Sequence, residues 1–165
     1  MKCDNWLNKV LENKEQRQAK QWELLEKFNS PILSLSINIP GAKKDSEDAK
    51  YIYEIALQQI ANLQLKEYQK ILTCKDTGYE ALFCFNIDAK ELKILTCKIE
   101  ENHPLGRFMD MDVIDTNKQI LSRKNPRKCY LCEENAKKCA RSQKHSIQEL
   151  LAYISKTVDD YKSSL

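Results

Sequence analysis

Glycine is scarce in this sequence, with three residues in 165, at Gly41, Gly78 and Gly106. No P-loop and no G-x-G-x-x-G dinucleotide loop can be drawn, so any phosphate must be held by side chains, a helix N-terminus or a metal ion. No apolar run approaches the roughly 18 residues of a membrane span, and the first residues lack the apolar core of a signal peptide. We therefore expect a cytoplasmic protein without membrane contact, whose seven cysteines are thiols or metal ligands rather than disulfides.

Charge is unevenly distributed, although the formal net charge is only +3. Between Lys118 and Lys144, nine lysines and arginines stand against two acidic residues, which gives a local charge of +7. Such a block is either a solvated basic face or a surface for an anionic partner such as phosphates, nucleic acid or an acidic protein. The length suits one domain, so we expect a single domain over 1–165 in which 118–165 forms a basic, cysteine-rich C-terminal segment.

Hydrophobic periodicity predicts an α+β fold. The expected helices cover about 5–28, 46–65 and 146–161, with one helical turn at 88–91, and the expected strands cover 32–39, 68–74, 80–87, 92–99, 110–113 and 119–122. Asp4 or Asn5 is the expected N-cap of the first helix, and Asp45 or Ser46 that of the second. The polar middle of the first helix, 12–21, is interpreted as a solvated face. Short turns between strands indicate a single antiparallel or mixed sheet with helices packed on it.

Asp110 and Asp112, in the sequence M-D-M-D-V, form a candidate metal site. Residues two apart share one face of a strand, so both carboxylates project together while Met111 and Val113 face the core. Two adjacent carboxylates repel each other, and Mg²⁺ relieves that repulsion while taking its other ligands from water and substrate phosphates. The alternative is an edge strand with two acidic residues on its wet face.

A second candidate metal site combines Cys129, Cys132, Cys139 and His145. A C-x-x-C turn can place both sulfurs on one ion, and three thiolates with one imidazole would complete a structural Zn²⁺ site. Because only one C-x-x-C is present, buried thiols beside a helix are the alternative. The competing function for the chain is a small zinc-stapled basic module that binds nucleic acid, although few aromatic residues interleave the basic block.

The stretch from His103 to Asp115, H-P-L-G-R-F-M-D-M-D-V-I-D, resembles the signature of the citrate lyase holo-acyl-carrier-protein synthase family. These enzymes are also called apo-citrate lyase phosphoribosyl-dephospho-CoA transferases. The resemblance continues at 121–123, 126–132, 136–142, 145–146 and 149–151, and upstream at Glu15, Arg17, Gln21 and 38–41. Two departures are a turn at 116–118 without the usual glycine, and Tyr130 in place of the usual leucine.

The resemblance implies a nucleotidyltransferase. Such an enzyme moves the prosthetic group from triphosphoribosyl-dephospho-CoA to a serine of the citrate lyase acyl carrier protein (gamma subunit) and releases pyrophosphate. It implies that Asp110 and Asp112 hold Mg²⁺ and that Gly106 lets the backbone approach the donor. The implied phosphate-binding and substrate-binding side chains are Arg17, Arg107, Arg123, Arg127 and Arg141. Gly-Arg followed by Asp-x-Asp on a strand also resembles a shortened polymerase-beta-type signature, which implies a nucleotidyltransferase-like fold.

The general base stays open at this point. His103 would act on the incoming serine or would shape the turn before Pro104. Glu100 or Glu101 would be a third metal ligand or the base. The basic C-terminal segment would dock the carrier protein if that partner is acidic.

Overall fold

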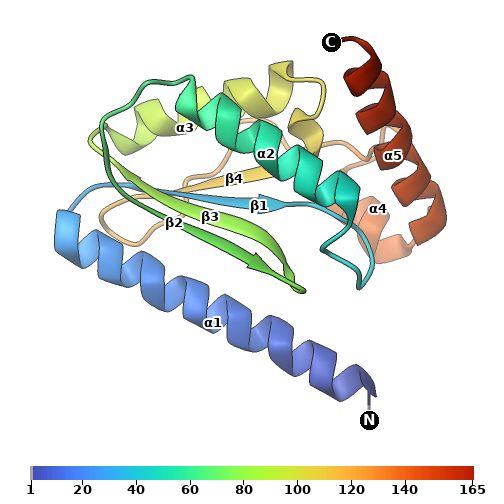
Figure 1. Ribbon diagram of the computed structural model, residues 1–165, viewed down its shortest axis with the longest axis horizontal. Coiled ribbons are helices and arrows are strands. Elements are labelled where there is room, and N and C mark those ends of the chain that lie inside the picture. The colour runs from blue at the N-terminus through green and yellow to red at the C-terminus, as the bar shows by residue number, and fades with distance from the viewer. Residues whose placement is uncertain (1) are drawn as a thin grey trace.

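The structure, a computed structural model, describes residues 2–165 and the side chains from Asn5 onward. Its centre is an antiparallel sheet of four strands in the order β2-β3-β1-β4 (Figure 1). The helices are α1 (Lys2–Phe28), α2 (Glu47–Ala61), α3 (Ala89–Asn102), α4 (Ala136–Ser142) and α5 (Ile147–Ser163). The strands are β1 (Ile32–Ile37), β2 (Glu67–Lys75), β3 (Gly78–Phe85) and β4 (Met109–Ile114), and a 3-10 turn, η1 (Gly106–Phe108), leads into β4. The expected α+β class is confirmed, with the antiparallel alternative.

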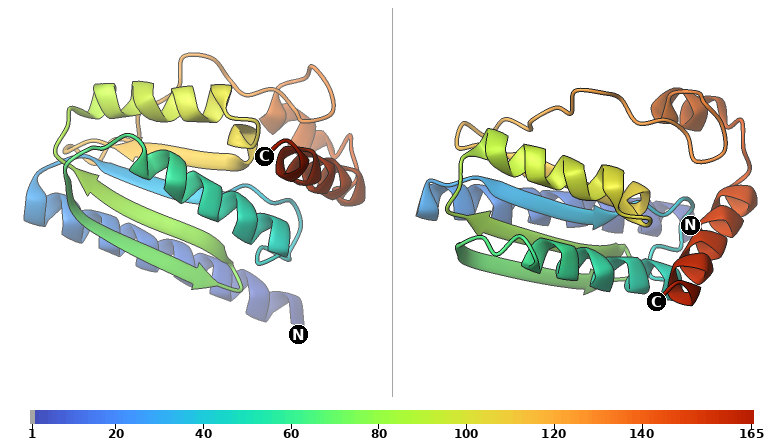
Figure 2. Two further views of the ribbon diagram at one scale, coloured as in Figure 1. Left: turned by 45° about the horizontal axis from the view of Figure 1, so that its top comes forward. Right: turned by 90° about the horizontal axis from the view of Figure 1, so that it is seen from above.

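Helices cover both faces of the sheet, with α2 and α3 on one face and α1 on the other (Figure 2). Side chains alternate across each strand, so Leu33 and Met111 pack towards α2 and α3, whereas Ile32 and Leu82 pack against Leu24 of α1. α4 and α5 stand at one end of these layers, where α5 contacts α2 (Figure 1). None of the helices within residues 2–165 is long and apolar enough to cross a membrane.

The strand expected over 92–99 is wrong, because this stretch belongs to α3. The Asp88 carboxylate accepts the first free amides of the helix and acts as its N-cap. Leu92, Thr96 and Ile99 are buried at helical spacing and form the face that packs on the sheet. The apolar residues between them also alternate, and this alternation produced the wrong prediction.

Several predicted boundaries shift. The strand expected over 32–39 ends at Ile37, and the expected strand over 119–122 is reduced to a single bridge between Ile114 and Ile120. The hairpin of β2 and β3 is confirmed. The expected helix over 146–161 is also confirmed as α5, although it packs at the end of the layers rather than on the face of the sheet.

The helix starts are set by capping side chains. Ser46 accepts the Ala49 amide at 3.2 Å and is the N-cap of α2, as predicted. α1 begins at Lys2, so the prediction that Asp4 or Asn5 caps it is wrong. The capping box at the start of α5 joins Ser146 to Glu149 and fixes the orientation of that helix at the end of the sheet.

The prediction that the polar middle of α1 is a solvated face is wrong for one side of the helix. Asn13 and Gln21 are buried and Arg17 is partly buried. These three residues recur every four positions and therefore share one side of the helix. Arg17 donates to Glu80 at 2.5 Å, and Gln21 donates to Ser34 at 3.1 Å. α1 thus covers the sheet with polar as well as apolar side chains.

Candidate active site

Asp110 and Asp112 lie side by side on β4, the strand at one edge of the sheet. Met111 and Val113 are fully buried on the opposite face, so the predicted alternation is confirmed. The two aspartates stand opposite Ser36 and Ser34 of β1 on the face that α1 covers. The Asp110 side chain keeps 47% of its surface exposed. The arrangement leaves two carboxylates together with one of them open to solvent.

The environment of Asp112 disfavours a second negative charge. Burial raises the pKa of Asp112, and the neighbouring Asp110 carboxylate raises it further, against weaker opposing effects of Lys93, Arg127 and Arg17. A pair of carboxylates in this state fits a divalent cation, because the cation supplies the positive charge that the surrounding residues supply only in part.

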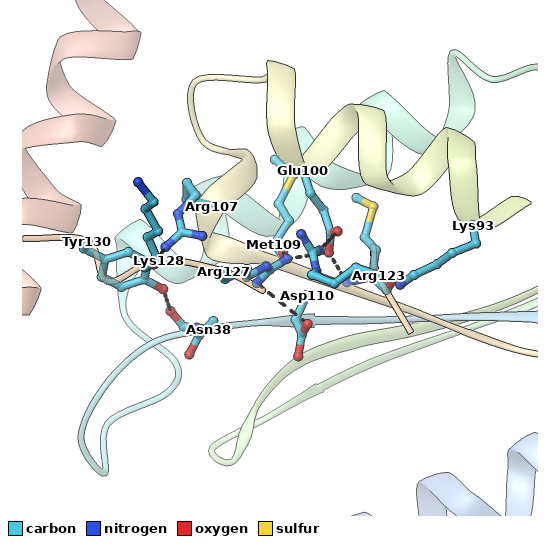
Figure 3. A network of polar contacts seen from close by, with 11 residues as sticks. Asn38, Lys93, Glu100, Arg107, Met109, Asp110, Arg123, Arg127, Lys128 and Tyr130 are labelled. Atoms are coloured by element: carbon cyan, nitrogen blue, oxygen red, sulfur yellow. Dashed lines mark hydrogen bonds and ion pairs between the residues drawn. The ribbon is translucent and has the colours of Figure 1, made fainter. Parts of the chain in front are cut away.

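Charged side chains cap the free edge of β4. Glu100 of α3 is 3% exposed and accepts the Met111 amide at 2.9 Å. Lys93 donates to the Met111 carbonyl at 3.2 Å, and Arg127 donates to the Met109 carbonyl at 2.7 Å (Figure 3). Each of these bonds satisfies a backbone group that an edge strand would otherwise expose. They also hold the strand that carries the two aspartates against α3 and the segment before α4.

Glu100 also gathers two of the predicted arginines. Arg127 donates to one of its oxygens at 2.5 Å, and Arg123 bonds to the other (Figure 3). Burial raises the pKa of Glu100, while Arg127, the Met111 amide and Arg123 favour its charged form. With both oxygens engaged, Glu100 positions arginines, and the structure favours this role over the expected third metal ligand or base.

A cavity of about 660 Å³ adjoins this network. It lies between the loop after β1, the cysteine-rich segment and the N-terminus of α5. Its cationic lining consists of Lys44, Arg107 and Arg127, and none of the described residues that line it is acidic. Ile39 and Tyr130 provide apolar wall. The cavity therefore suits an anionic ligand that also carries an apolar or aromatic part.

Arg127 connects the cavity with the aspartates. One guanidinium nitrogen lies 3.8 Å from an Asp110 oxygen, while the same side chain lines the cavity. Arg107 lies close by, stacked 5.4 Å from the centre of the Tyr130 ring and bonded to the Lys128 carbonyl (Figure 3). Burial lowers the pKa of Arg107, and the positive charge of Arg127 lowers it further. Arg107, whose hydrogen bond goes to a backbone carbonyl, keeps its positive charge available for an anion, whereas Arg127 is partly neutralised by Glu100.

The predicted cysteine and histidine residues come together beside the cavity. The ligand atoms of Cys129, Cys132, Cys139 and His145 all lie within 4.8 Å of one another. Burial acts to raise the pKa of the Cys129 thiol, but hydrogen bonds from the Leu131 amide and the neighbouring thiols lower it overall. Burial and the other two thiols raise the pKa of Cys139 to about 12. Hydrogen bonding therefore favours ionisation at Cys129, whereas thiols that share a site oppose one another's ionisation.

Two predicted residues have a clear role in the fold. Gly106 is buried against α3, where an added Cβ would lie 2.5 Å from the carbonyl oxygens of Ile99 and Glu100. His103 accepts the Leu105 amide at its Nδ1 atom at 3.0 Å, and burial lowers its pKa. Its ring packs against Tyr161, which joins the apolar cluster on the sheet face opposite the aspartates. The structure thus supports the turn-shaping alternative for His103.

The remaining predicted arginines lie apart from the cavity. Arg17 pairs with Glu80 under α1, near Asp112, and Arg123 is held by Glu100. Arg141 is exposed in the last turn of α4. Sequence reasoning missed Lys44 as a lining residue, although its position after the Pro40-Gly41 turn was a usable signal. It also missed the positioning role of Glu100, for which spacing gives no signal because the partners lie 23 and 27 residues away.

Comparison with known proteins gives one consistent result. Residues 5–161 match the family described as CitX, apo-citrate lyase phosphoribosyl-dephospho-CoA transferase. A Vibrio cholerae protein named probable apo-citrate lyase phosphoribosyl-dephospho-CoA transferase is 37% identical over 164 residues, which cover 94% of this chain and 92% of the relative. An Escherichia coli apo-citrate lyase phosphoribosyl-dephospho-CoA transferase is 32% identical over 92% of this chain and 87% of its own length. Protein CitXG of Haemophilus influenzae is 33% identical over 88% of this chain, but only 33% of that longer protein is covered. The chain belongs to the apo-citrate lyase phosphoribosyl-dephospho-CoA transferase family.

Proposed function

We propose that this transferase moves a phosphoribosyl-dephospho-CoA group from triphosphoribosyl-dephospho-CoA to a serine hydroxyl of the citrate lyase acyl carrier protein. The family membership supports the transfer and its acceptor. The location of the active site rests on one observation, the cavity lined by Lys44, Arg107 and Arg127. Arg127 connects this cavity with Asp110. The reaction would take place where the cavity meets β4. The transfer reaction gives the aspartate pair a role, whereas the nucleic-acid-binding alternative does not.

Asp110 and Asp112 would hold Mg²⁺. The fit rests on their shared face, the exposure of Asp110 and the raised pKa of Asp112, which together indicate a need for positive charge. The ion, when bound, would neutralise phosphate oxygens of the donor. We assign no other residue to the ion, because both Glu100 oxygens already accept hydrogen bonds from Arg123, Arg127 and the Met111 amide.

Arg107, Arg127 and Lys44 would bind the donor phosphates, because guanidinium forks match phosphate oxygens. Tyr130 and the apolar wall would contact the less polar part of the donor. In the transfer, the serine oxygen bonds to the phosphorus nearest the ribose, and the bond from that phosphorus to the next phosphate breaks. Pyrophosphate leaves with the bonding electrons, and the hydroxyl proton passes to a base or to water. This step needs positioning and charge neutralisation more than covalent chemistry from the protein.

We place the reaction in the cytoplasm, because the cysteines from Cys74 onward are thiols and thiols persist in a reducing compartment. η1 carries Gly106 and Arg107 directly into β4 with its two aspartates, and this order supports a nucleotidyltransferase-like arrangement.

Mass spectrometry of the carrier protein tests the function. The purified protein, the triphosphoribosyl donor and Mg²⁺ are incubated with the apo-carrier, and the carrier is expected to gain the mass of one phosphoribosyl-dephospho-CoA group. A carrier with its acceptor serine changed to alanine is the matched control and should gain none. An unmodified wild-type carrier, under conditions in which the Escherichia coli relative modifies it, would overturn the proposal.

A further inference from the structure

The Cys129 segment is folded as a compact knuckle. A backbone bridge joins Lys128 and Asn135, and the Cys129 amide donates to the Glu134 carbonyl at 2.8 Å. The turn inside it brings the Leu131 amide to the Cys129 sulfur at 3.5 Å. An amide that points at a sulfur favours the thiolate, which is the form that binds metals. The local fold thus prepares a sulfur ligand.

Cys132 lies in the same knuckle, between Lys128 and Asn135. The other two ligands come from separate elements, since Cys139 is buried in α4 and His145 directly precedes the N-cap of α5. The Cys132 and Cys139 sulfurs are 4.0 Å apart, and the His145 Nε2 atom lies 3.3 Å from the Cys132 sulfur. A tetrahedral ion with zinc–sulfur bonds of about 2.3 Å and zinc–nitrogen bonds of about 2.0 Å requires separations of roughly 3.8 and 3.5 Å. The cluster already approaches this geometry.

We propose that Cys129, Cys132, Cys139 and His145 bind one Zn²⁺ ion as a structural site. With three thiolates and one imidazole all four positions are filled by protein, so the ion itself carries no chemistry. The ion joins the knuckle, α4 and the start of α5. The apolar core does reach the knuckle through Tyr130 and α5 through Ile154 and Val158. Cys129, Cys139 and His145 also line the basic cavity. The ion therefore holds one wall of that cavity in place.

The metal content of the full chain tests this proposal. Protein purified with a thiol reductant and without chelator is expected to contain one zinc per chain by mass spectrometry of the metal. Replacement by Co²⁺ should give the intense visible absorption of a tetrahedral site and a near-ultraviolet thiolate-to-cobalt band. Cys132→Ser should lose most of the metal. Cys74→Ser is the matched control, because Cys74 is an exposed thiol on β2 outside the cluster, and it should retain the full amount.

His145→Ala serves if Cys132→Ser does not fold. It keeps three thiolates, so Co²⁺ should still bind, but with a shifted visible spectrum. Hydrogen exchange supplies a second readout. Chelation should speed amide exchange in residues 128–146 and leave the strands β1 and β3 unchanged. Substoichiometric zinc after anaerobic loading, a disulfide among the three cysteines in reduced protein, or full metal retention in Cys132→Ser would each overturn the proposal. None of these outcomes depends on transferase activity.

Discussion

Arg127 donates to the buried Glu100 carboxylate at 2.5 Å, and this ion pair holds the arginine between the cavity and the aspartate pair. The Glu100 side chain is 2% exposed, so its charge depends on its partners for stabilisation. The ion pair also holds Arg127, a loop residue, beside the edge strand β4. Glu100 comes from α3, whereas Arg127 comes from the irregular segment before α4. Their contact joins that segment to α3, and the bond from Arg127 to the Met109 carbonyl joins it to β4.

Glu100→Gln should weaken both the fold and the donor site. The amide can still accept from the Met111 amide, but Arg123 and Arg127 lose the charge that orients them. We expect a loss of about 1–3 kcal/mol in the free energy of unfolding, measured in urea. KM for the donor should rise. Glu101→Gln, at the exposed neighbouring position, is the control and should change neither quantity.

Asp110→Asn and Asp112→Asn should remove activity while they stabilise the metal-free protein. Each substitution removes one carboxylate of a repelling pair, so Tm without Mg²⁺ should rise by about 1–4 °C. The rate of carrier modification at saturating donor should fall by about 10²-fold or more. Asp159→Asn, on the exposed side of α5, is the matched control. Near-normal activity in both variants would contradict the metal-ligand roles.

The pH dependence of stability should reveal the raised pKa of Asp112. Because its pKa is raised in the folded protein, folding favours the protonated carboxyl. Its stabilising contribution is therefore present below the unfolded pKa near 4 and is lost as the pH rises through the higher folded value. The difference in Tm between Asp112→Asn and wild type, without metal, should widen from acid to neutral pH. Mg²⁺ should narrow that difference at neutral pH, since it binds the charged form of the wild type. A Tm difference that does not change with pH would show that the pKa of Asp112 is not raised in the folded protein.

The sequence predicts local features better than it predicts partners. The alternation on β4, the Ser46 cap and the hairpin depend on neighbouring residues, and all are confirmed. The polar side of α1 was misread because Gln21 is satisfied by Ser34, and that contact exists only once the helix lies on the sheet. The apolar residues of 92–99 fit both the helical and the strand period, and only the Asp88 N-cap distinguishes a helix from a strand. The proximity of the four metal ligands depends on the path of the chain between them, which spacing alone does not determine.

Gly106→Ala separates two roles of this glycine. The added Cβ would lie 2.5 Å from two backbone carbonyl oxygens of α3, so we expect a loss of about 1–3 kcal/mol in the free energy of unfolding. Urea unfolding measures this loss. The predicted role in donor approach would instead lower activity in a protein of unchanged stability. Unchanged unfolding combined with lost activity would therefore favour the donor role over the packing role.

Lys44→Met should weaken donor binding without affecting the aspartate site. Lys44 lines the cavity and donates to the Ile39 carbonyl, so its ammonium is held at the cavity wall. Burial lowers the pKa of Lys44, and none of the described residues that line the cavity is a carboxylate that could pair with it. Loss of one charged contact should raise the donor Kd about tenfold, measured by calorimetry. Lys43→Met is the control at the exposed neighbouring position and should leave the Kd unchanged. Equal effects of the two substitutions would mean that only the overall charge matters, and would place the donor phosphates outside this cavity.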